Sequence, residues 1–218
     1  MNTSFNPRPG GWYLLVFYLL ALLLFIPLFV IRAIDGFDFW WWMSSNLILL
    51  VSLALILEND FRIKLKKDAG KDVARKVSIG ILSAVILYFV FFLGDILSRR
   101  LFGFAGEEIG NIYMFKAGAK PIRIILLMLL IIGPGEELFW RGFLQRKMSL
   151  RFGKVMGFIL TTILYAGVHI ASGNFMLVAA AFVCGIFWGW LYLRYQSMLI
   201  NVVSHTLWDI AVFMVLPF

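Results

Sequence analysis

Long apolar runs separated by short polar segments make up most of this chain. The first run covers Gly11–Ile31, and after a polar turn at residues 35–38 a second run ends at Leu57. About 20 apolar residues are enough for a helix to cross a bilayer. Five later runs of this kind lie at residues 77–97, 121–148, 155–171, 175–193 and 197–216. The pattern therefore predicts an all-α polytopic membrane protein with about seven transmembrane helices.

The segments between these runs are expected to lie outside the membrane. Residues 58–76 are rich in lysine and arginine, which predicts a solvated loop. Residues 98–120 mix charged and apolar side chains and predict a loop or a short interfacial segment. The triplet Gly133-Pro134-Gly135 is expected to kink the fourth helix, which continues through it, because proline lacks a backbone donor and glycine is a poor helix former.

The composition is typical of a membrane protein, and it affects how the positive net charge of the chain is interpreted. Of the 218 residues, 62% are hydrophobic and 15% are charged, whereas soluble proteins are about 25% charged. The net charge of +8 is read as the basic excess of cytoplasmic loops facing membrane lipids, so no nucleic acid partner is expected. The single cysteine, Cys184, excludes a disulfide framework.

The distribution of basic residues predicts an orientation. With seven spans and a cytoplasmic N-terminus, 14 of the 20 lysines and arginines fall on the cytoplasmic side and 6 on the other. Cytoplasmic loops carry the excess of basic residues in membrane proteins. The sequence therefore favours a cytoplasmic N-terminus in a cell membrane, and the compact size with sparse loops is typical of a bacterial protein.

Three charged residues stand in the middle of the fourth apolar run. Glu137 and Arg141 are four positions apart and share one helix face, whereas Glu136 points about 100° away. An ionisable side chain at the bilayer centre costs about 2.5–3.5 kcal/mol on insertion scales. One reading is that both glutamates hold neighbouring helices together. The other is that Arg141 neutralises Glu137 while Glu136 is left to act as a general base.

The only two histidines also lie in apolar runs. Tyr165 and His169 are four positions apart on the fifth run, as are His205 and Asp209 on the seventh. Each pair alone can serve as a structural contact, and Asp209 can also fix the tautomer of His205 or join it in binding a metal. A common polar intramembrane cavity would satisfy all of these groups, and a carboxylate meeting imidazoles and water suits hydrolysis.

The expected depths of the two histidines differ. With a rise of 1.5 Å per residue, His205 lies roughly 12 Å and His169 roughly 20 Å from the expected cytoplasmic starts of their helices. We therefore expect tilted helices or a different start for the fifth helix.

These residues form three motifs that resemble the CPBP family, the CAAX-protease and bacteriocin-processing membrane proteins, also called Abi. The motifs are Glu136-Glu137-Leu-Phe-Trp-Arg141, Tyr165-Ala-Gly-Val-His169 and His205-Thr-Leu-Trp-Asp209. The resemblance covers about residues 122–216. It implies a catalytic core at 121–216 preceded by three accessory helices within residues 1–97, in a single membrane domain.

The resemblance implies an intramembrane endopeptidase acting on a membrane-associated or exported peptide. Glu136 and His169 would activate the attacking water, and His205 with Asp209 would stabilise the oxyanion, with Glu137, Arg141 and Tyr165 in support. Asp209 stands where eukaryotic prenyl-protein endopeptidases have asparagine, and an ionised carboxylate cannot donate to an oxyanion. Either Asp209 is protonated, or it orients His205, or the group binds a divalent metal.

Several alternatives remain open at this level. No cofactor is firmly expected, but Glu136, His169, His205 and Asp209 could ligate a metal such as zinc, although the zinc-protease helix motif is absent. A non-catalytic role in bacteriocin immunity or regulation is the main alternative function. A proton-coupled transporter is less favoured because no internal repeat is found. A prenylated CAAX tail is not the expected natural substrate in a bacterial context, and the oligomeric state cannot be read from the chain.

Overall fold

The protein is a bundle of helices with a broad apolar surface. The computed structural model describes residues 11–218, and no strand forms among them. Six of the described helices are long and apolar enough to cross a membrane. The prediction of an all-α polytopic membrane protein is confirmed. Residues 1–10, which include Arg8 of the 14 basic residues assigned to the cytoplasmic side, lie outside the described residues.

The membrane-crossing helices follow the apolar runs closely. They are α1 (Gly11–Ile31), α2 (Phe39–Leu57), α4 (Val73–Leu101), α9 (Lys154–Val168), α10 (Phe175–Tyr195) and α11 (Met198–Ile210). Short helices η4 (His169–Ser172) and η5 (Ala211–Val215) extend α9 and α11. The start of α9 at Lys154 agrees with the predicted 155, so a shifted helix start does not explain the expected difference in depth between the histidines.

The fourth predicted span is helical along its whole length. It is not among the six long apolar helices of the described residues because every stretch of it that is long enough to cross a membrane holds more than two charged residues. It consists of α6 (Pro121–Leu127), η2 (Met128–Ile132), α7 (Gly133–Glu137), η3 (Leu138–Gln145) and α8 (Arg146–Phe152). The segments η2 and η3 are π-helical. Pro134 has no N–H to continue the regular hydrogen-bond ladder, and wide π-turns are frequent at functional sites. The two π-helical segments thus lie on either side of the Gly133-Pro134-Gly135 triplet, where the sequence predicts a kink.

Both segments between the apolar runs contain helices, although the basic one was predicted as a solvated loop and the mixed one as a loop or a short interfacial segment. Helix α3 (Asn59–Ala69) occupies most of the basic segment, and α5 (Ala105–Tyr113) occupies the mixed one. In α3, Phe61 is only 2% exposed and anchors the helix to the bundle. Asp60 in the first turn and two lysines in the last turn suit the helix dipole. A short amphipathic helix lying across the end of the bundle thus replaces the predicted loop.

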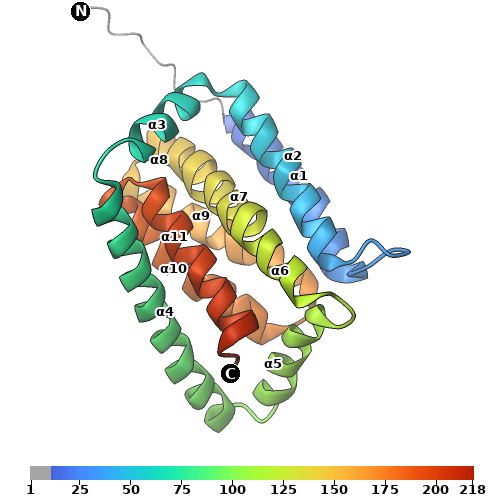
Figure 1. Cartoon of the computed structure of the whole chain (residues 1–218). Coiled ribbons are helices and arrows are strands. Elements are labelled where there is room, and N and C mark those ends of the chain that lie inside the picture. Colours follow the sequence, from blue (N-terminus) through green and yellow to red (C-terminus); the bar gives the residue numbers. More distant parts are fainter. Residues whose placement is uncertain (1–10) are drawn as a thin grey trace, which may run out of the picture.

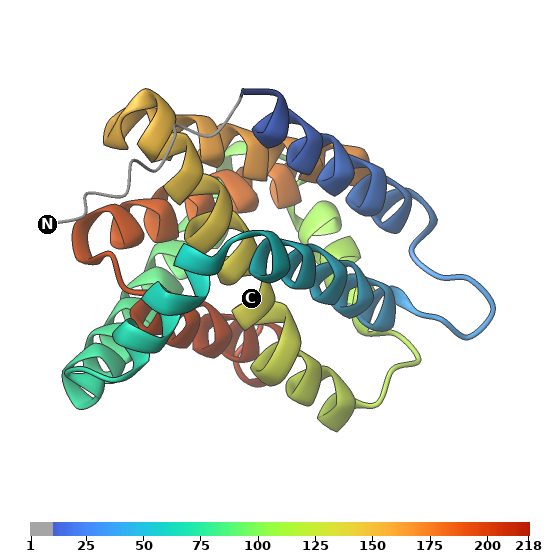
Figure 2. The ribbon, with the colours of Figure 1, turned by 90° about the horizontal axis from the view of Figure 1, so that it is seen from above.

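The fourth span, from α6 to α8, lies in the middle of the bundle (Figure 1). Helix α7 packs against α11 and α2, α4 covers α11, and α10 pairs with α9. Seen from above, α3 crosses the end of the bundle next to the end of α2 (Figure 2). This arrangement brings the motif residues of α7, α9 and α11 to the interior.

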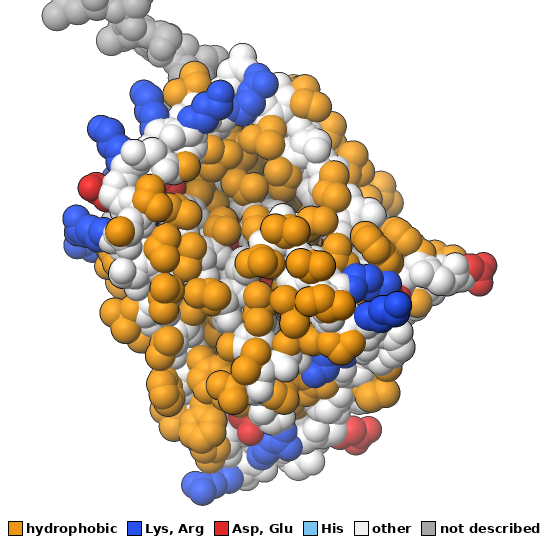
Figure 3. Space-filling view, viewed as in Figure 1, with side chains coloured by type: hydrophobic (Ala, Val, Ile, Leu, Met, Phe, Trp, Pro, Cys, Tyr) orange, Lys and Arg blue, Asp and Glu red, His pale blue; other side chains and the backbone are white. Residues whose placement is uncertain are grey.

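The surface is divided into zones by charge. Figure 3 shows lysine and arginine side chains gathered at the end of the bundle that carries α3, above a wide hydrophobic belt. The opposite end, near α5, carries fewer basic side chains mixed with acidic ones. The belt is the surface expected to face lipid.

Candidate active site

The two adjacent glutamates of α7 point into different surroundings. Glu136 lines a cavity between the helices, whereas Glu137 is fully buried outside the cavity lining. This divergence follows from the helical rotation of about 100° per residue. The pair therefore supplies one carboxylate to the cavity and one to the packing behind it.

Glu137 is the centre of a buried hydrogen-bond network. Its Oε1 accepts hydrogen bonds from Arg141 Nη1 at 2.8 Å and from His205 Nδ1 at 2.8 Å. Its Oε2 accepts from Asn201 Nδ2 at 2.9 Å. The Arg141 guanidinium is 1% exposed and lies 4.5 Å from the Tyr165 ring centroid. Three donors and one full countercharge satisfy this carboxylate, as a buried ion requires.

Glu136 has a different partner. The Tyr165 hydroxyl donates to Glu136 Oε2 at 2.7 Å. Both side chains line the cavity, and Glu136 is 6% exposed. A single neutral donor leaves more acceptor capacity on Glu136 than three donors leave on Glu137. Glu136 is thus placed to accept a hydrogen bond from a molecule in the cavity.

The tautomer of His169 follows from its partner. His169 Nδ1 lies 2.8 Å from the backbone carbonyl of Tyr165. Because a carbonyl only accepts, Nδ1 carries the proton and donates. In the neutral ring, Nε2 then keeps its lone pair and can accept a proton. The ring lines the same cavity as Glu136 and packs against Phe29, with ring centroids 5.0 Å apart.

His205 is held between two carboxylates. Its Nδ1 is bound by Glu137 on one side, and its Nε2 lies 3.5 Å from Asp209 Oδ2 on the other. The Trp188 ring stacks on the imidazole with centroids 3.6 Å apart. The shorter contact shows that the tautomer of His205 is fixed mainly by Glu137, which the sequence pattern did not indicate.

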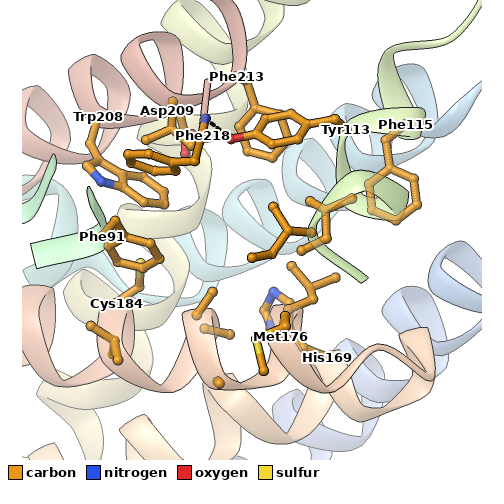
Figure 4. A pocket seen from close by; sticks show the side chains of 18 of the residues that line it. Phe91, Tyr113, Phe115, His169, Met176, Cys184, Trp208, Asp209, Phe213 and Phe218 are labelled. Atoms are coloured by element: carbon orange, nitrogen blue, oxygen red, sulfur yellow. Dashed lines mark hydrogen bonds between the residues drawn. The ribbon is translucent and has the colours of Figure 1, made fainter. Parts of the chain in front are cut away.

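All four residues with proposed chemical roles line one cavity of about 560 Å³. The cavity is walled largely by aromatic and aliphatic side chains, and its polar lining comprises the motif residues together with Asp95, Ser98 and Tyr113. Figure 4 shows Asp209 and Trp208 on one wall and His169 with Met176 on the facing wall. The structure thus brings together Glu136, Tyr165, His169, His205 and Asp209, while Glu137 and Arg141 support them from behind.

The cavity lies toward the α5 end of the bundle. Its lining includes Phe29 near the end of α1, Phe39 at the start of α2 and Phe102 just after α4. It also includes Tyr113 of α5 and Phe175 at the start of α10. These positions lie at the loops opposite α3. The cavity therefore extends from the motif residues toward the end with fewer basic residues.

The metal ligands considered for this site do not form a compact set. Among residues 11–218, no group of three or more His, Cys, Asp or Glu side chains is placed to hold a metal ion. His169 and His205 each use Nδ1 in a hydrogen bond within the protein. Only Nε2 of each ring would be left for a metal.

Sequence reasoning missed three residues around the site. Asn201 binds Glu137 and also donates to the Trp188 carbonyl at 2.8 Å. Trp188 stacks on His205, and Trp208 lines the cavity with an Nε1 that has no hydrogen-bond partner among the described residues. Asn201 stands four positions before His205, so the helical spacing could have indicated it. The role of Trp188 carried no such signal.

The segment that carries the three motifs is similar to a known protein family. Residues 118–211 match the family model described as type II CAAX prenyl endopeptidase Rce1-like. No curated protein and no solved structure matches the chain. The matched segment begins just before α6 and ends just after α11, and it contains all three motifs.

Proposed function

We propose that this chain is an intramembrane endopeptidase that uses Glu136 to activate water. The match of residues 118–211 to the type II CAAX prenyl endopeptidase Rce1-like family model supports this proposal. Residues 121–216 would form the catalytic core, and α1, α2 and α4 would be accessory helices. The single observation that carries the proposal is the separation of the glutamate pair, with Glu136 lining the cavity and Glu137 bound by three donors behind it.

The attacking water would lie between Glu136 and His169. Both side chains line the cavity, and the neutral His169 ring presents an acceptor at Nε2. Glu136 would take a proton from the water as the oxygen attacks the peptide carbonyl, and would pass it to the leaving amine. Tyr165 would hold the Glu136 carboxylate in place through its 2.7 Å hydrogen bond.

His205 would stabilise the oxyanion. Both ring nitrogens of His205 face carboxylates, which favours the doubly protonated imidazolium. With Nδ1–H held by Glu137, the Nε2–H of this imidazolium would be the group available to the developing negative charge. Asp209 lies 3.5 Å from that nitrogen, a distance at which it favours a proton on Nε2 without a full hydrogen bond. This arrangement supports the reading in which Asp209 orients His205 and favours its protonated form. Asp209 itself would then not donate a hydrogen bond to the oxyanion.

The surroundings of the cavity indicate the kind of substrate. Its walls are largely apolar and it lies toward the end opposite the basic α3. With the basic end in the cytoplasm, the cavity would face the outer side of the membrane. The substrate would then be an apolar segment of a membrane-associated or exported peptide.

Cleavage of candidate peptides by purified protein in detergent would test the proposal. We expect Glu136→Gln to abolish cleavage, because the amide cannot accept the proton of the water. Glu107→Gln is the matched control, since Glu107 is an exposed acid of α5. Full activity of Glu136→Gln would refute the mechanism.

Adding a metal chelator to the same assay distinguishes the glutamate mechanism from a metal-dependent one. We expect cleavage to survive chelation, whereas loss with chelator and recovery with zinc would assign the cavity to a metal. If the wild type cleaves no peptide but binds a bacteriocin or a regulatory partner, the non-catalytic alternative is favoured.

A further inference from the structure

A second cavity lies at the opposite end of the bundle from the candidate active site. It has a volume of about 400 Å³ and lies between α3, the start of α4, Arg146 of α8 and the junction of α10 with α11. Five basic and two acidic side chains line it: Lys64, Lys67, Lys71, Lys76 and Arg146, with Asp68 and Asp72. The cavity therefore has an excess of positive charge.

The acid closest to the junction with α11 is already neutralised. Asp68 accepts hydrogen bonds from Lys76 Nζ at 2.7 Å, from Leu199 N at 2.9 Å and from Ser197 Oγ at 3.1 Å. Asp68 thus ties α3 to the start of α11 and does not balance the remaining cations. Asp72 is exposed at the end of the connection to α4.

Arg146 provides a buried donor without an acceptor. The residue is 6% exposed and its Nε donates to the Gly142 carbonyl at 3.1 Å, yet Nη2 has no hydrogen-bond partner among the described residues. Glu58 Oε2 lies 3.8 Å from Nη2, beyond hydrogen-bonding distance, and it is bound by Lys147. A buried unsatisfied cationic donor calls for a ligand. Because Arg146 lines the cavity, an anion there would complete its hydrogen bonding.

Two lysines at the rim add further positive charge. Lys67 and Lys71 line the cavity, and neither forms a hydrogen bond or ion pair through its side chain with any other residue of the 11–218 range. The pKa of the neighbouring Lys64 is lowered by partial burial and by the charge of Arg146. An anion bound between these groups would relieve their repulsion.

We propose that this cavity binds the phosphate group of an anionic phospholipid. A guanidinium suits the planar, multiple hydrogen bonding of phosphate, and lysines at the rim suit its charge. The location favours a lipid over a soluble anion, since the cavity is lined by α3, and α3 lies at the basic end that borders the hydrophobic belt (Figure 3). Anionic headgroups concentrate at this depth of the cytoplasmic leaflet. The proposal does not depend on the catalytic reading of the other cavity.

Thermal unfolding of the purified protein in neutral detergent tests the site. The probes are short-chain phosphatidic acid, short-chain phosphatidylcholine and inorganic phosphate. The test variant is K67A/K71A, and the matched control is K66A/R75A, which removes two exposed cations of the same segment that do not line the cavity.

We expect phosphatidic acid to raise the Tm of the wild type and the control, because a ligand that binds the folded state stabilises it. Phosphatidylcholine should raise it much less. The apparent Kd for phosphatidic acid should weaken about thirtyfold in K67A/K71A. Equal weakening of phosphatidic acid binding in both double variants would show that the basic segment attracts the lipid diffusely, and it would overturn the proposed site. An equal shift with inorganic phosphate would overturn the lipid assignment, and no shift with any phosphate compound would overturn the proposal.

Discussion

His205 and Glu137 lie 68 positions apart in the chain and form a buried 2.8 Å hydrogen bond between Nδ1 and Oε1. The second glutamate of the pair therefore serves the histidine of α11 as well as Arg141. Asp209, the acid four positions from His205, is farther away at 3.5 Å. The histidine is thus oriented by a carboxylate on another helix, and the first glutamate is free to face the cavity.

Asn201 is predicted to act as a positioning residue through Glu137. Asn201→Ala removes the donor to Glu137 Oε2 and leaves a buried carboxylate under-satisfied, which costs about 1–3 kcal/mol of stability. We also expect kcat to fall while KM changes little, because His205 loses its fixed orientation without losing the cavity walls. Peptide cleavage kinetics and unfolding in detergent would measure both effects.

Asn46→Ala is the control for this prediction. Asn46 is also buried and donates to the Leu24 carbonyl at 2.8 Å, but it does not line the cavity. It should lose comparable stability and keep its kcat. If Asn201→Ala also keeps its kcat, Asn201 is only structural.

Gly133 allows the close approach of α7 to α11. A Cβ at this position would lie 2.3 Å from Thr206 Oγ1 and 3.0 Å from Thr206 Cα. Gly133→Ala should therefore separate the helices that carry Glu137 and His205, with a cost of about 1–3 kcal/mol from overpacking and a loss of peptidase activity.

Gly110→Ala in α5 provides the comparison. A Cβ added at Gly110 would meet no atom within 4 Å, and alanine in a helix is favoured over glycine by about 0.5–1 kcal/mol. This variant should be as stable as the wild type or more so. Equal unfolding temperatures for the two variants would contradict the role of Gly133 as a contact point.

The membrane architecture could be predicted because each apolar run carries its own signal. The ends of α1 and the start of α9 agree with the predicted ranges to within one residue. Helix α3 was missed because its sequence is strongly basic and its one buried anchor, Phe61, gives no periodic pattern. The count of seven includes the charged fourth span, which is helical throughout but is not one of the six long apolar helices of the described residues.

The candidate site was predictable only where its residues are close in sequence. The spacing of Glu137 and Arg141 indicated their pairing, and the structure shows this ion pair at 2.8 Å. The contact between Glu137 and His205 was not predictable, because it depends on how α7 and α11 pack. The two histidines line the same cavity although their helix positions indicated different depths. Local periodicity thus gives the helix faces, and tertiary packing decides which faces meet.

The predicted orientation can be tested with introduced cysteines. In a Cys184→Ala background, Lys66→Cys places a thiol on the exposed face of α3, and Glu107→Cys places one on the exposed face of α5. We expect a membrane-impermeant maleimide to label the Glu107→Cys protein in intact cells and the Lys66→Cys protein only after lysis. The reverse pattern would place the basic end outside and the catalytic cavity on the cytoplasmic side.

The contacts of Asp68 predict a loss of stability in acid. Burial alone would raise the pKa of Asp68, but the hydrogen bonds from Lys76, Leu199 and Ser197 outweigh it and lower the pKa. A carboxyl whose folded-state pKa lies below its unfolded value stabilises the protein above the unfolded value of about 3.9. This contribution is lost as the pH falls through the folded-state pKa, because both states are then protonated. The unfolding temperature in detergent should therefore decrease when the pH is lowered below about 4.

Asp68→Asn should be less stable at neutral pH and lose part of this acid dependence. Asp60→Asn on the same helix is the comparison, and an identical acid response in both variants would show that the α3–α11 contact does not depend on the Asp68 charge.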